Sequence, residues 1–445
     1  MLLRNALSRK TRTLFITSIL LAAGSSVQAV SYANASDVGG ASPGVASAEQ
    51  AFVQIGASTK EARSRLADLG VSIESLRSDS VWGFASPSVL ARVKAAHFKV
   101  LSHTPAHLLD FPSQDARFHN YQEALAALQD LNAKNPDITR IQSIGKSVEG
   151  RDLWAFHINT TPEALASGVS GKPGAIFMGN HHAREHLSLE VPLMLAEYLL
   201  TNRKDPKIAA LLDSRDIWVI PMVNPDGAEW DIASGSYRSW RKNRRDNGSG
   251  VFGVDLNRNY GFKWGTGGSS SDATSDVFKG KTAFSEPETQ AVRDFVDAHL
   301  NTKVLLTFHS YSELILYPWG HKYNPIENTR DHDVFTKMAT TMAKWNGYTP
   351  EQSSSLYIAS GDTTDWAYGA HGIFAFTFEL SPSDGWSGGG FYPGAKVIDK
   401  VFQDNLNPCL YMLDVADDPY RVLGTQPTGG LHSYVEPWVD PALRW

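Results

Sequence analysis

From residue 120 onward, short apolar segments alternate with segments whose apolar positions recur at helical spacing. The expected strands cover residues 141–144, 153–158, 175–178, 217–223, 304–308, 314–317 and 374–378, and the expected helices cover 120–135, 189–201, 207–212, 286–300, 333–345 and 395–416. Such alternation is typical of an α/β fold in which helices cover a buried sheet. Residues 224–283 are mostly irregular, and a loop region of that length inside a compact domain is usually functional.

A shorter pattern precedes this large domain. The expected strands cover residues 51–55, 71–76, 81–85 and 98–101, and the expected helices cover 60–69 and 88–96. The order βαββαβ predicts a small ferredoxin-like α+β domain over about residues 50–102, just long enough to hold its own core. Residues 102–117 show no periodicity and predict a linker. A small domain and a linker ahead of a large domain are typical of a secreted zymogen; a permanent accessory domain is the alternative.

The first 29 residues predict a signal peptide. Basic residues precede an apolar run from Leu14 to Ala23, and Val27-Gln28-Ala29 places small residues where signal peptidase cleaves. The apolar run is about 10 residues long, whereas a membrane span needs roughly 20. We therefore expect a secreted protein, extracellular or periplasmic, with no membrane anchor once the signal is removed.

The composition, with 42% hydrophobic and 20% charged residues, provides enough apolar surface for a large core. The net charge of -6, with both signs interspersed, argues against a nucleic-acid partner. Cys409 is the only cysteine, so stability must come from packing or bound ions rather than from an internal disulfide. Cys409 itself is expected to be a buried thiol in the last helix.

The densest cluster of polar side chains directly follows the third expected strand of the large domain. It contains His182 and Glu185, and an imidazole and a carboxylate three positions apart form a ligand pair suited to zinc. An alternative is the inverted zincin pattern H-x-x-E-H, in which His182 and His186 both bind the metal and Glu185 is the base. That alternative requires one turn of helix, whereas Gly179 and Asn180 stand directly after a strand.

Ligands of an α/β sheet gather at the carboxyl ends of its strands, where the sequence provides two further candidates. His309 follows the strand 304–308, and Glu379 follows the strand 374–378. Two histidines and one glutamate leave a fourth position at zinc open for water, and Glu379 could take a proton from that water. Asp255, in the irregular region, is expected to fix the orientation of a ligating imidazole.

Two basic segments of the irregular region, SWRKNRR and GVDLNRN, indicate how a substrate is recognised. A guanidinium fork binds a carboxylate through two parallel hydrogen bonds, and an adjacent amide can add another. Arg258 suits this role because it stands between apolar Leu256 and aromatic Tyr260. Lys242 and Arg245 are better suited to the surface, as solvated charges.

Six sequence blocks follow one another across nearly the whole large domain: HARE, RKNR, DLNRN, FHSYSELILYPWG, LYIASGDTTDWAYG and FTFEL. Together they resemble the zinc metallocarboxypeptidases of the pancreatic carboxypeptidase A/B type, a group that includes bacterial carboxypeptidase T. The resemblance implies a mixed central sheet flanked by helices and one zinc ion per catalytic domain. It also implies that the substrates are peptides or proteins with a free C-terminal carboxylate, from which the last residue is removed.

The resemblance implies a role for each candidate residue. The zinc ligands would be His182, Glu185 and His309. Glu379 would activate the water and later protonate the leaving amine, while Arg244 would polarise the scissile carbonyl. The groups that hold the substrate carboxylate would be Asn257, Arg258 and Tyr357, assisted further out by Arg184 and Arg241.

The pocket for the last side chain of the substrate is lined, in this family, by the segment after the clamp tyrosine. Pancreatic enzymes carry an apolar residue or a carboxylate at the position that matches Thr364, which is small and neutral here. Asp362 could meet the head group of a lysine or arginine. We therefore expect mixed specificity for apolar and basic C-terminal residues.

The stretch that begins with Asp110 resembles the mature N-terminus of carboxypeptidase T, so activation cleavage is expected near Leu109. Residues 30–109 would then be a propeptide that inhibits its own enzyme, residues 110–420 the catalytic domain, and residues 421–445 a C-terminal extension without an assigned role. The resemblance also implies structural calcium, and we expect a monomer.

Two alternatives remain open. A peptidoglycan-directed peptidase or amidase of the same superfamily would be expected to alter the carboxylate clamp or to carry wall-binding modules. A non-catalytic peptide-binding relative would be expected to lack a metal ligand or the base. The sequence shows none of these departures.

Overall fold

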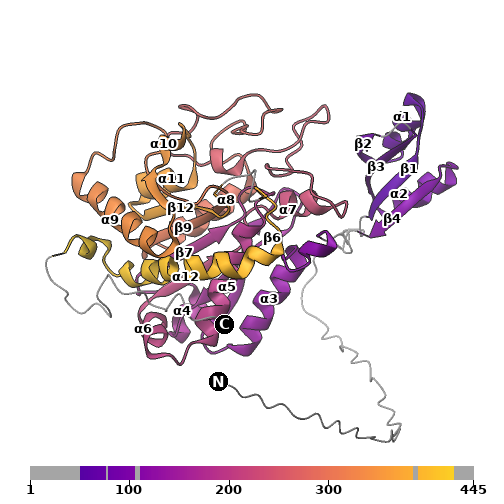
Figure 1. The fold of residues 1–445 in the computed structure, drawn as a ribbon. Coiled ribbons are helices and arrows are strands. Elements are labelled where there is room, and N and C mark those ends of the chain that lie inside the picture. The colour runs from indigo at the N-terminus through magenta and orange to yellow at the C-terminus, as the bar shows by residue number, and fades with distance from the viewer. Residues whose placement is uncertain (1–50, 77–78, 106–110, 384–388, 425–445) are drawn as a thin grey trace, which may run out of the picture. The chain divides into compact units, whose positions relative to one another are not determined.

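The structure is a computed structural model that describes residues 51–76, 79–105, 111–383 and 389–424 (Figure 1). The expected signal peptide, the expected cleavage position at Leu109 and residues 425–445 of the C-terminal extension lie outside the described residues. In the part of the chain that is described, no helix is both long enough and apolar enough to cross a membrane.

The small domain has the topology that its sequence pattern predicts. Its elements are β1 Ala51–Gly56, α1 Lys60–Asp68, β2 Ser72–Leu76, β3 Ser80–Ala85, α2 Pro87–Ala95 and β4 Val100–Pro105. Neighbouring strands pair antiparallel in the order β2-β3-β1-β4, which is the ferredoxin-like arrangement. The domain has its own apolar core, formed by residues that include Val53, Ile55, Leu66, Val81, Leu90 and Val93.

The large domain is built on a mixed sheet whose strands, within the described residues, follow the order β11-β10-β12-β9-β7-β8-β6-β5. The strands are β5 Thr139–Lys146, β6 Asp152–Ile158, β7 Gly174–Gly179, β8 Asp216–Ile220, β9 Thr302–Ser310, β10 Leu314–Tyr317, β11 Thr349–Gln352 and β12 Phe374–Leu380. The central strands β12, β9, β7 and β8 are parallel, whereas β10 and β6 run antiparallel to their central neighbours. Every residue of β7 and β8 is buried, as expected for strands covered on both faces. The predicted mixed sheet is confirmed.

Helices cover both faces of this sheet (Figure 1). They are α3 Tyr121–Lys134, α4 Pro162–Ser167, α5 Leu187–Thr201, α6 Pro206–Ser214, α7 Pro225–Ile232, α8 Pro287–Ala298, α9 Thr329–Asn346, α10 Ser353–Leu356, α11 Thr363–His371 and α12 Ile398–Val415. One face packs against α3, α5, α9 and α12, and the other packs against α8 and α11. Alternate residues of one strand serve the two cores, because Phe177 points to the first and Ile176 and Met178 point to the second. Cys409 is buried in α12 without a disulfide partner, as predicted.

The elements that lie outside the expected pattern are short and polar. They are α4, α7, β11, α10 and α11, and an apolar period is weak over so few residues. α11 nevertheless carries a local signal, because Asp362 accepts hydrogen bonds from the backbone nitrogens of Thr364 and Asp365 as a helix N-cap.

The end of the predicted linker differs from expectation. Phe111 and Asp115 are buried against the large domain, and Ser113–Asp115 form a short 3-10 helix. The carboxylate of Asp115 accepts hydrogen bonds from Tyr237 and from the backbone of Ala395, which are far away in sequence, so no local periodicity reveals these contacts.

Candidate active site and metal centre

The turn between β7 and α5 carries the first two candidate ligands, His182 and Glu185. Gly179 is the last residue of β7, and no other residue fits at this position because a Cβ there would lie 2.0 Å from the carbonyl oxygen of Ser188. Asn180 follows with a positive φ of 54° and donates from its side chain to the carbonyl oxygens of His182 and Ala183. The sequence therefore folds into a compact turn rather than a helix, and both side chains are directed to the same point.

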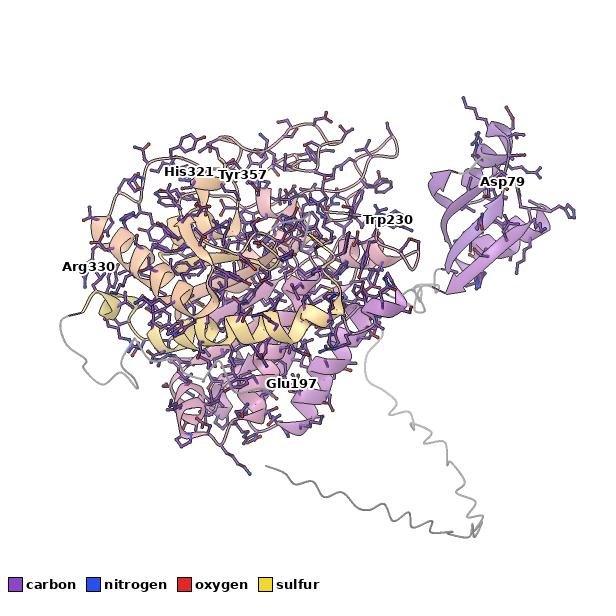
Figure 2. The ribbon with its side chains drawn as sticks, in the orientation of Figure 1. Asp79, Glu197, Trp230, His321, Arg330 and Tyr357 are labelled. Carbon is purple, nitrogen blue, oxygen red and sulfur yellow. The ribbon has the colours of Figure 1, made fainter. Side chains whose placement is uncertain are left out.

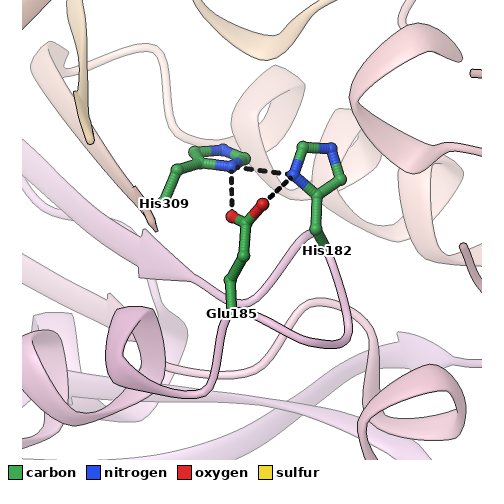
Figure 3. A group of neighbouring side chains, drawn as sticks. All are labelled: His182, Glu185 and His309. Atoms are coloured by element: carbon green, nitrogen blue, oxygen red, sulfur yellow. Dashed lines mark hydrogen bonds and ion pairs between the residues drawn. The ribbon is translucent and has the colours of Figure 1, made fainter. Parts of the chain in front are cut away.

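His309 completes a group of three side chains (Figure 3). It lies near the carboxyl end of β9, and its Nδ1 atom is 3.1 Å from Nδ1 of His182 and 3.0 Å from Oε2 of Glu185. Nδ1 of His182 is 2.8 Å from Oε1 of Glu185. Among the described residues, no other group of three or more His, Cys, Asp or Glu side chains has ligand atoms this close together, so the implied calcium gains no support.

The donor set of this group fits zinc. Two imidazole Nδ1 atoms face each other although each presents a lone pair when it is unprotonated, and a cation between them removes the repulsion. Tetrahedral zinc with Zn–N distances of about 2.0–2.1 Å places two ligand nitrogens about 3.3 Å apart, close to the separation seen here. Burial lowers the pKa of His309 and so favours the neutral imidazole that binds metals. Although burial acts against it, His182 and His309 lower the pKa of Glu185 far below its ordinary value.

His186 does not join this group. Its Nε2 atom lies 2.9 Å from Oδ2 of Asp231, away from the three ligand atoms. The inverted zincin alternative, which needs His186 as a ligand, therefore does not fit the geometry.

Asp255 connects one histidine of the group to an arginine. Its Oδ1 atom lies 3.1 Å from Nε2 of His182, which turns Nδ1 of that ring toward the other ligands. Its Oδ2 atom accepts a hydrogen bond from Nε of Arg241 at 3.0 Å, and Nη2 of Arg241 lies 2.9 Å from the same oxygen in an ion pair. Asp255 is fully buried, so both contacts are made without competition from water.

A cleft with a volume of about 300 Å³ opens beside the three-residue group. The predicted residues that line it are His182, Glu185, Arg241, Asn257, Arg258, Tyr357, Asp362, Thr364 and Glu379. A larger hollow of about 640 Å³ lies over α5 and α12, but none of these residues lines it. The chemistry therefore belongs to the smaller cleft.

Arg258 is the buried cation of this cleft, with 3% of its surface exposed. Its Nη1 atom donates to the carbonyl oxygen of Asn257 at 2.7 Å, and its Nη2 atom donates to the hydroxyl of Tyr357 at 3.3 Å. Asn257 is itself fixed, because its Oδ1 atom accepts from the backbone nitrogen and the hydroxyl of Thr363. Tyr357 is half exposed and lies at the surface above α11 (Figure 2).

Glu379 lies one strand away from the metal group. It is near the carboxyl end of β12 and stands opposite His309 in the parallel pairing with β9. Burial raises the pKa of Glu379 well above its ordinary value, and the Glu185 carboxylate adds to the shift. A carboxyl group with a raised pKa is better able to hold and to return a proton.

Residues 124–408, most of the large domain and more than half of the chain, match the family model for zinc carboxypeptidases. The chain belongs to the zinc carboxypeptidase family. A zinc carboxypeptidase of Saccharothrix mutabilis subsp. capreolus is 37% identical over 413 residues, which span 87% of this chain and 94% of that protein. Human carboxypeptidase A1 is 32% identical over 311 residues, which span 68% of this chain and 72% of that protein. The crystal structure of carboxypeptidase A from Helicoverpa armigera has a TM-score of 0.60 and 26% identity, and the match covers 83% of this chain and 98% of that one.

As a member of the zinc carboxypeptidase family, the protein is an enzyme, a metallocarboxypeptidase that acts on peptides. Zinc is the metal that the family implies, and the group of His182, Glu185 and His309 is the place in the described chain that fits it.

One arginine of this zinc carboxypeptidase is not where the resemblance implies. The guanidinium group of Arg244 packs 3.8 Å from the ring centroid of Trp230 and also contacts Trp240 and Phe252. Trp230 lies well apart from Tyr357 at the cleft (Figure 2). Arg241, three positions earlier, lines the cleft instead, and its Nη1 atom is 3.9 Å from Oε1 of Glu185. The structure therefore brings Arg241, and not Arg244, to the cleft, where the resemblance places Arg244.

Asp362 has one oxygen engaged and one unpaired. Its Oδ1 atom caps α11 and also accepts from the Thr364 hydroxyl at 2.8 Å, whereas Oδ2 is buried without a hydrogen-bond partner. Burial raises the pKa of Asp362 to about 7, and the nearby Asp365 carboxylate adds to the shift. An unpaired buried carboxylate oxygen in a cleft is suited to a cationic ligand.

Arg184 contacts Phe391, a cleft residue that the sequence did not predict. Its guanidinium group lies 4.2 Å from the ring centroid of Phe391, and Phe391 lines the cleft. Tyr311 lines the cleft as well and contacts the same ring at 4.9 Å. Neither aromatic residue belongs to a metal-like or basic motif, and only the FHSYSEL block carried a signal for Tyr311.

Proposed function

We propose that this zinc carboxypeptidase removes single residues from the C-terminus of peptides with a free terminal carboxylate. The observation that carries the proposal is the buried guanidinium group of Arg258 in the same cleft as the His182, Glu185 and His309 group. A buried cation without an opposing anion is costly, so a terminal carboxylate is favoured and a mid-chain peptide, which has none, is rejected. Asn257 and Tyr357, which contact or border Arg258, would complete the carboxylate clamp.

Glu379 and Arg241 of this chain would perform the proton transfer and the stabilisation of negative charge in the proposed reaction. When bound, zinc would supply Lewis-acid chemistry, polarising the scissile carbonyl and lowering the pKa of water. Glu379 takes the proton of the attacking water on its carboxylate and passes it to the nitrogen of the leaving amino acid. Arg241 donates to the carbonyl oxygen as negative charge develops there, and Asp255 holds its guanidinium group in place.

The specificity proposal rests on Asp362 and Thr364. The unpaired Oδ2 atom of Asp362 would bind the head group of a C-terminal lysine or arginine, while the small Thr364 leaves room for apolar side chains. Thr364→Ile should favour apolar substrates, because it adds apolar surface and removes a hydroxyl.

The proposal includes export as a zymogen. Residues 1–29 would be removed as a signal, and the ferredoxin-like domain would be a propeptide that inhibits the enzyme until cleavage near Leu109. Mass spectrometry of the secreted protein tests this: a mature N-terminus near Asp110 is expected, and a chain that keeps its N-terminus at Val30 would contradict it.

The test of the central proposal compares blocked dipeptides with free and with amidated C-termini, each with and without a zinc chelator. Hydrolysis should be confined to the free carboxylate and should stop with the chelator. Comparable hydrolysis of the amidated form would remove the carboxylate clamp from the proposal. Activity that survives complete loss of zinc would remove the metal.

A further inference from the structure

A cluster of aromatic side chains lies beside the cleft and takes no part in the proposed reaction. We call it the aromatic anchor, and its members are Phe111, His186, Tyr237 and Tyr392. The rings of Tyr237 and Tyr392 stack at 3.9 Å, and the ring of Phe111 meets His186 edge-on at 4.8 Å. The anchor thus joins the first described residue of the large domain to three distant parts of the chain.

Two buried carboxylates hold the aromatic anchor. Asp115 accepts from the hydroxyl of Tyr237 at 2.8 Å and from the backbone nitrogen of Ala395 at 2.9 Å. Asp231 accepts from the hydroxyl of Tyr392, with 3.0 Å between the oxygens. Hydrogen bonds to buried carboxylates are stronger than those between neutral groups. Asp231 therefore fixes one end of the loop 392–395, at Tyr392, and Asp115 fixes the other end, at Ala395.

Asp231 also fixes two other segments that contribute to the cleft. It lies 2.9 Å from Nε2 of His186, which directly follows Glu185. It also accepts from the backbone nitrogen of Trp240 at 2.7 Å, directly before Arg241. Three cleft-forming segments therefore meet at one buried carboxylate.

The cleft residue that depends most directly on the anchor is Phe391, the neighbour of Tyr392. Its ring packs against Arg184 and Tyr311, whereas Arg258 and Tyr357 contact each other in the same cleft. If the terminal carboxylate binds at Arg258, the substrate residues that precede the cleaved bond extend away from it, toward Phe391. This step rests on the proposed exopeptidase function.

We propose that Asp115 and Tyr392 are positioning residues for substrate binding. They do not touch the substrate; they hold Phe391 at the wall of the cleft, where it contacts substrate residues that lie two or more positions before the cleaved bond and that a dipeptide lacks. Asp115 lies in the segment that follows the expected activation site, so this segment contributes to the binding of longer peptides.

The experiment uses two blocked peptides with the same C-terminal residue, a dipeptide and a pentapeptide, and measures kcat and KM separately for each. Tyr392→Phe removes the bond to Asp231 and keeps the ring stack, while Asp115→Asn weakens the bonds to Tyr237 and Ala395. For both variants we expect KM for the pentapeptide to rise about threefold to tenfold, as for the partial loss of one charge-assisted hydrogen bond. The kcat for both peptides and the KM for the dipeptide should stay at wild-type values.

The matched control is Arg117→Ala. Arg117 belongs to the same segment, but its ion pair with Asp399 is exposed and lies outside the aromatic anchor. This variant should leave KM for both peptides unchanged, and thermal unfolding should show that all three variants are folded.

Each result bears on one proposal. Wild-type KM for the pentapeptide in Tyr392→Phe and Asp115→Asn would overturn the positioning role, and so would an equal rise for dipeptide and pentapeptide, which indicates general damage to the site. Wild-type enzyme that cleaves amidated and free peptides alike would instead overturn the exopeptidase function on which the inference rests.

Discussion

His182 and Arg241 bind the two oxygens of one buried carboxylate, that of Asp255. The arrangement couples the orientation of the His182 imidazole, a proposed metal ligand, to the position of an arginine in the cleft. A partner of this kind fixes which ring nitrogen faces the metal and raises the basicity of the ligand.

Asp255→Asn should weaken zinc binding by about 10-fold to 100-fold, because an amide cannot accept from both partners through two oxygens. Competition with a chelator of known affinity measures the effect. The control is Asp216→Asn, since Asp216 lies 2.6 Å from His157 in a similar buried pair at the other end of the parallel strands. Equal zinc affinity in the two variants would contradict the role of Asp255.

Substitution of each arginine of the RKNR block by lysine tests which of the two acts at the scissile carbonyl. Arg241→Lys should lower kcat by about 10²-fold to 10³-fold, as does the loss of a donor to a developing oxyanion, with little change in KM. Arg244→Lys should lower the thermal midpoint through its contacts with Trp230 and leave kcat unchanged. The opposite pattern would return the role to Arg244.

The metal group could be predicted from the sequence because its chemistry and its position are both local. His182 and Glu185 are three residues apart, and His309 and Glu379 follow apolar runs that form neighbouring strands. In a parallel sheet, the carboxyl ends of neighbouring strands meet, so a pattern of strands is enough to bring these side chains together.

The choice between Arg241 and Arg244 could not be predicted in the same way. Both lie in a segment without regular structure, where no period indicates which side chain faces the cleft. The outcome depends on Trp230, from α7, which packs on Arg244, and on Asp255, which holds Arg241. Phe391 and the aromatic anchor were missed for the same reason, since their contacts join residues far apart in the chain.

Substitution of two glutamates of the site should lower the activity of the enzyme in both cases but should remove zinc in only one. Glu379→Gln should lower kcat by about 10²-fold to 10⁴-fold, as expected for a lost general base, while zinc content stays at one ion per chain. Glu185→Gln should lose zinc as well as activity, because it removes the charged ligand. Metal analysis after gel filtration separates the two cases, and loss of zinc from Glu379→Gln would place Glu379 among the ligands.

The charge of Asp362 should make specificity depend on pH. A carboxyl group with a pKa of about 7 is mostly neutral at pH 6 and mostly ionised at pH 8, so its attraction for a cation appears as the pH rises. The ratio of kcat/KM for C-terminal arginine to that for C-terminal leucine should therefore increase between about pH 6 and 8. Both substrates use the same Glu379 and Arg241, so the pH dependence of the chemical step cancels in the ratio.

Asp362→Asn provides the decisive comparison for this pH dependence. The amide cannot ionise, so the ratio should become flat with pH, and kcat/KM for the arginine substrate should fall about tenfold or more at pH 8, as for the loss of one partner of a buried ion pair. Cleavage of the leucine substrate should change little, because an apolar side chain does not use Oδ2. A fall of equal size for both substrates would mean that Asp362 acts only as the cap of α11, and a ratio that still rises with pH would assign the titration to another group.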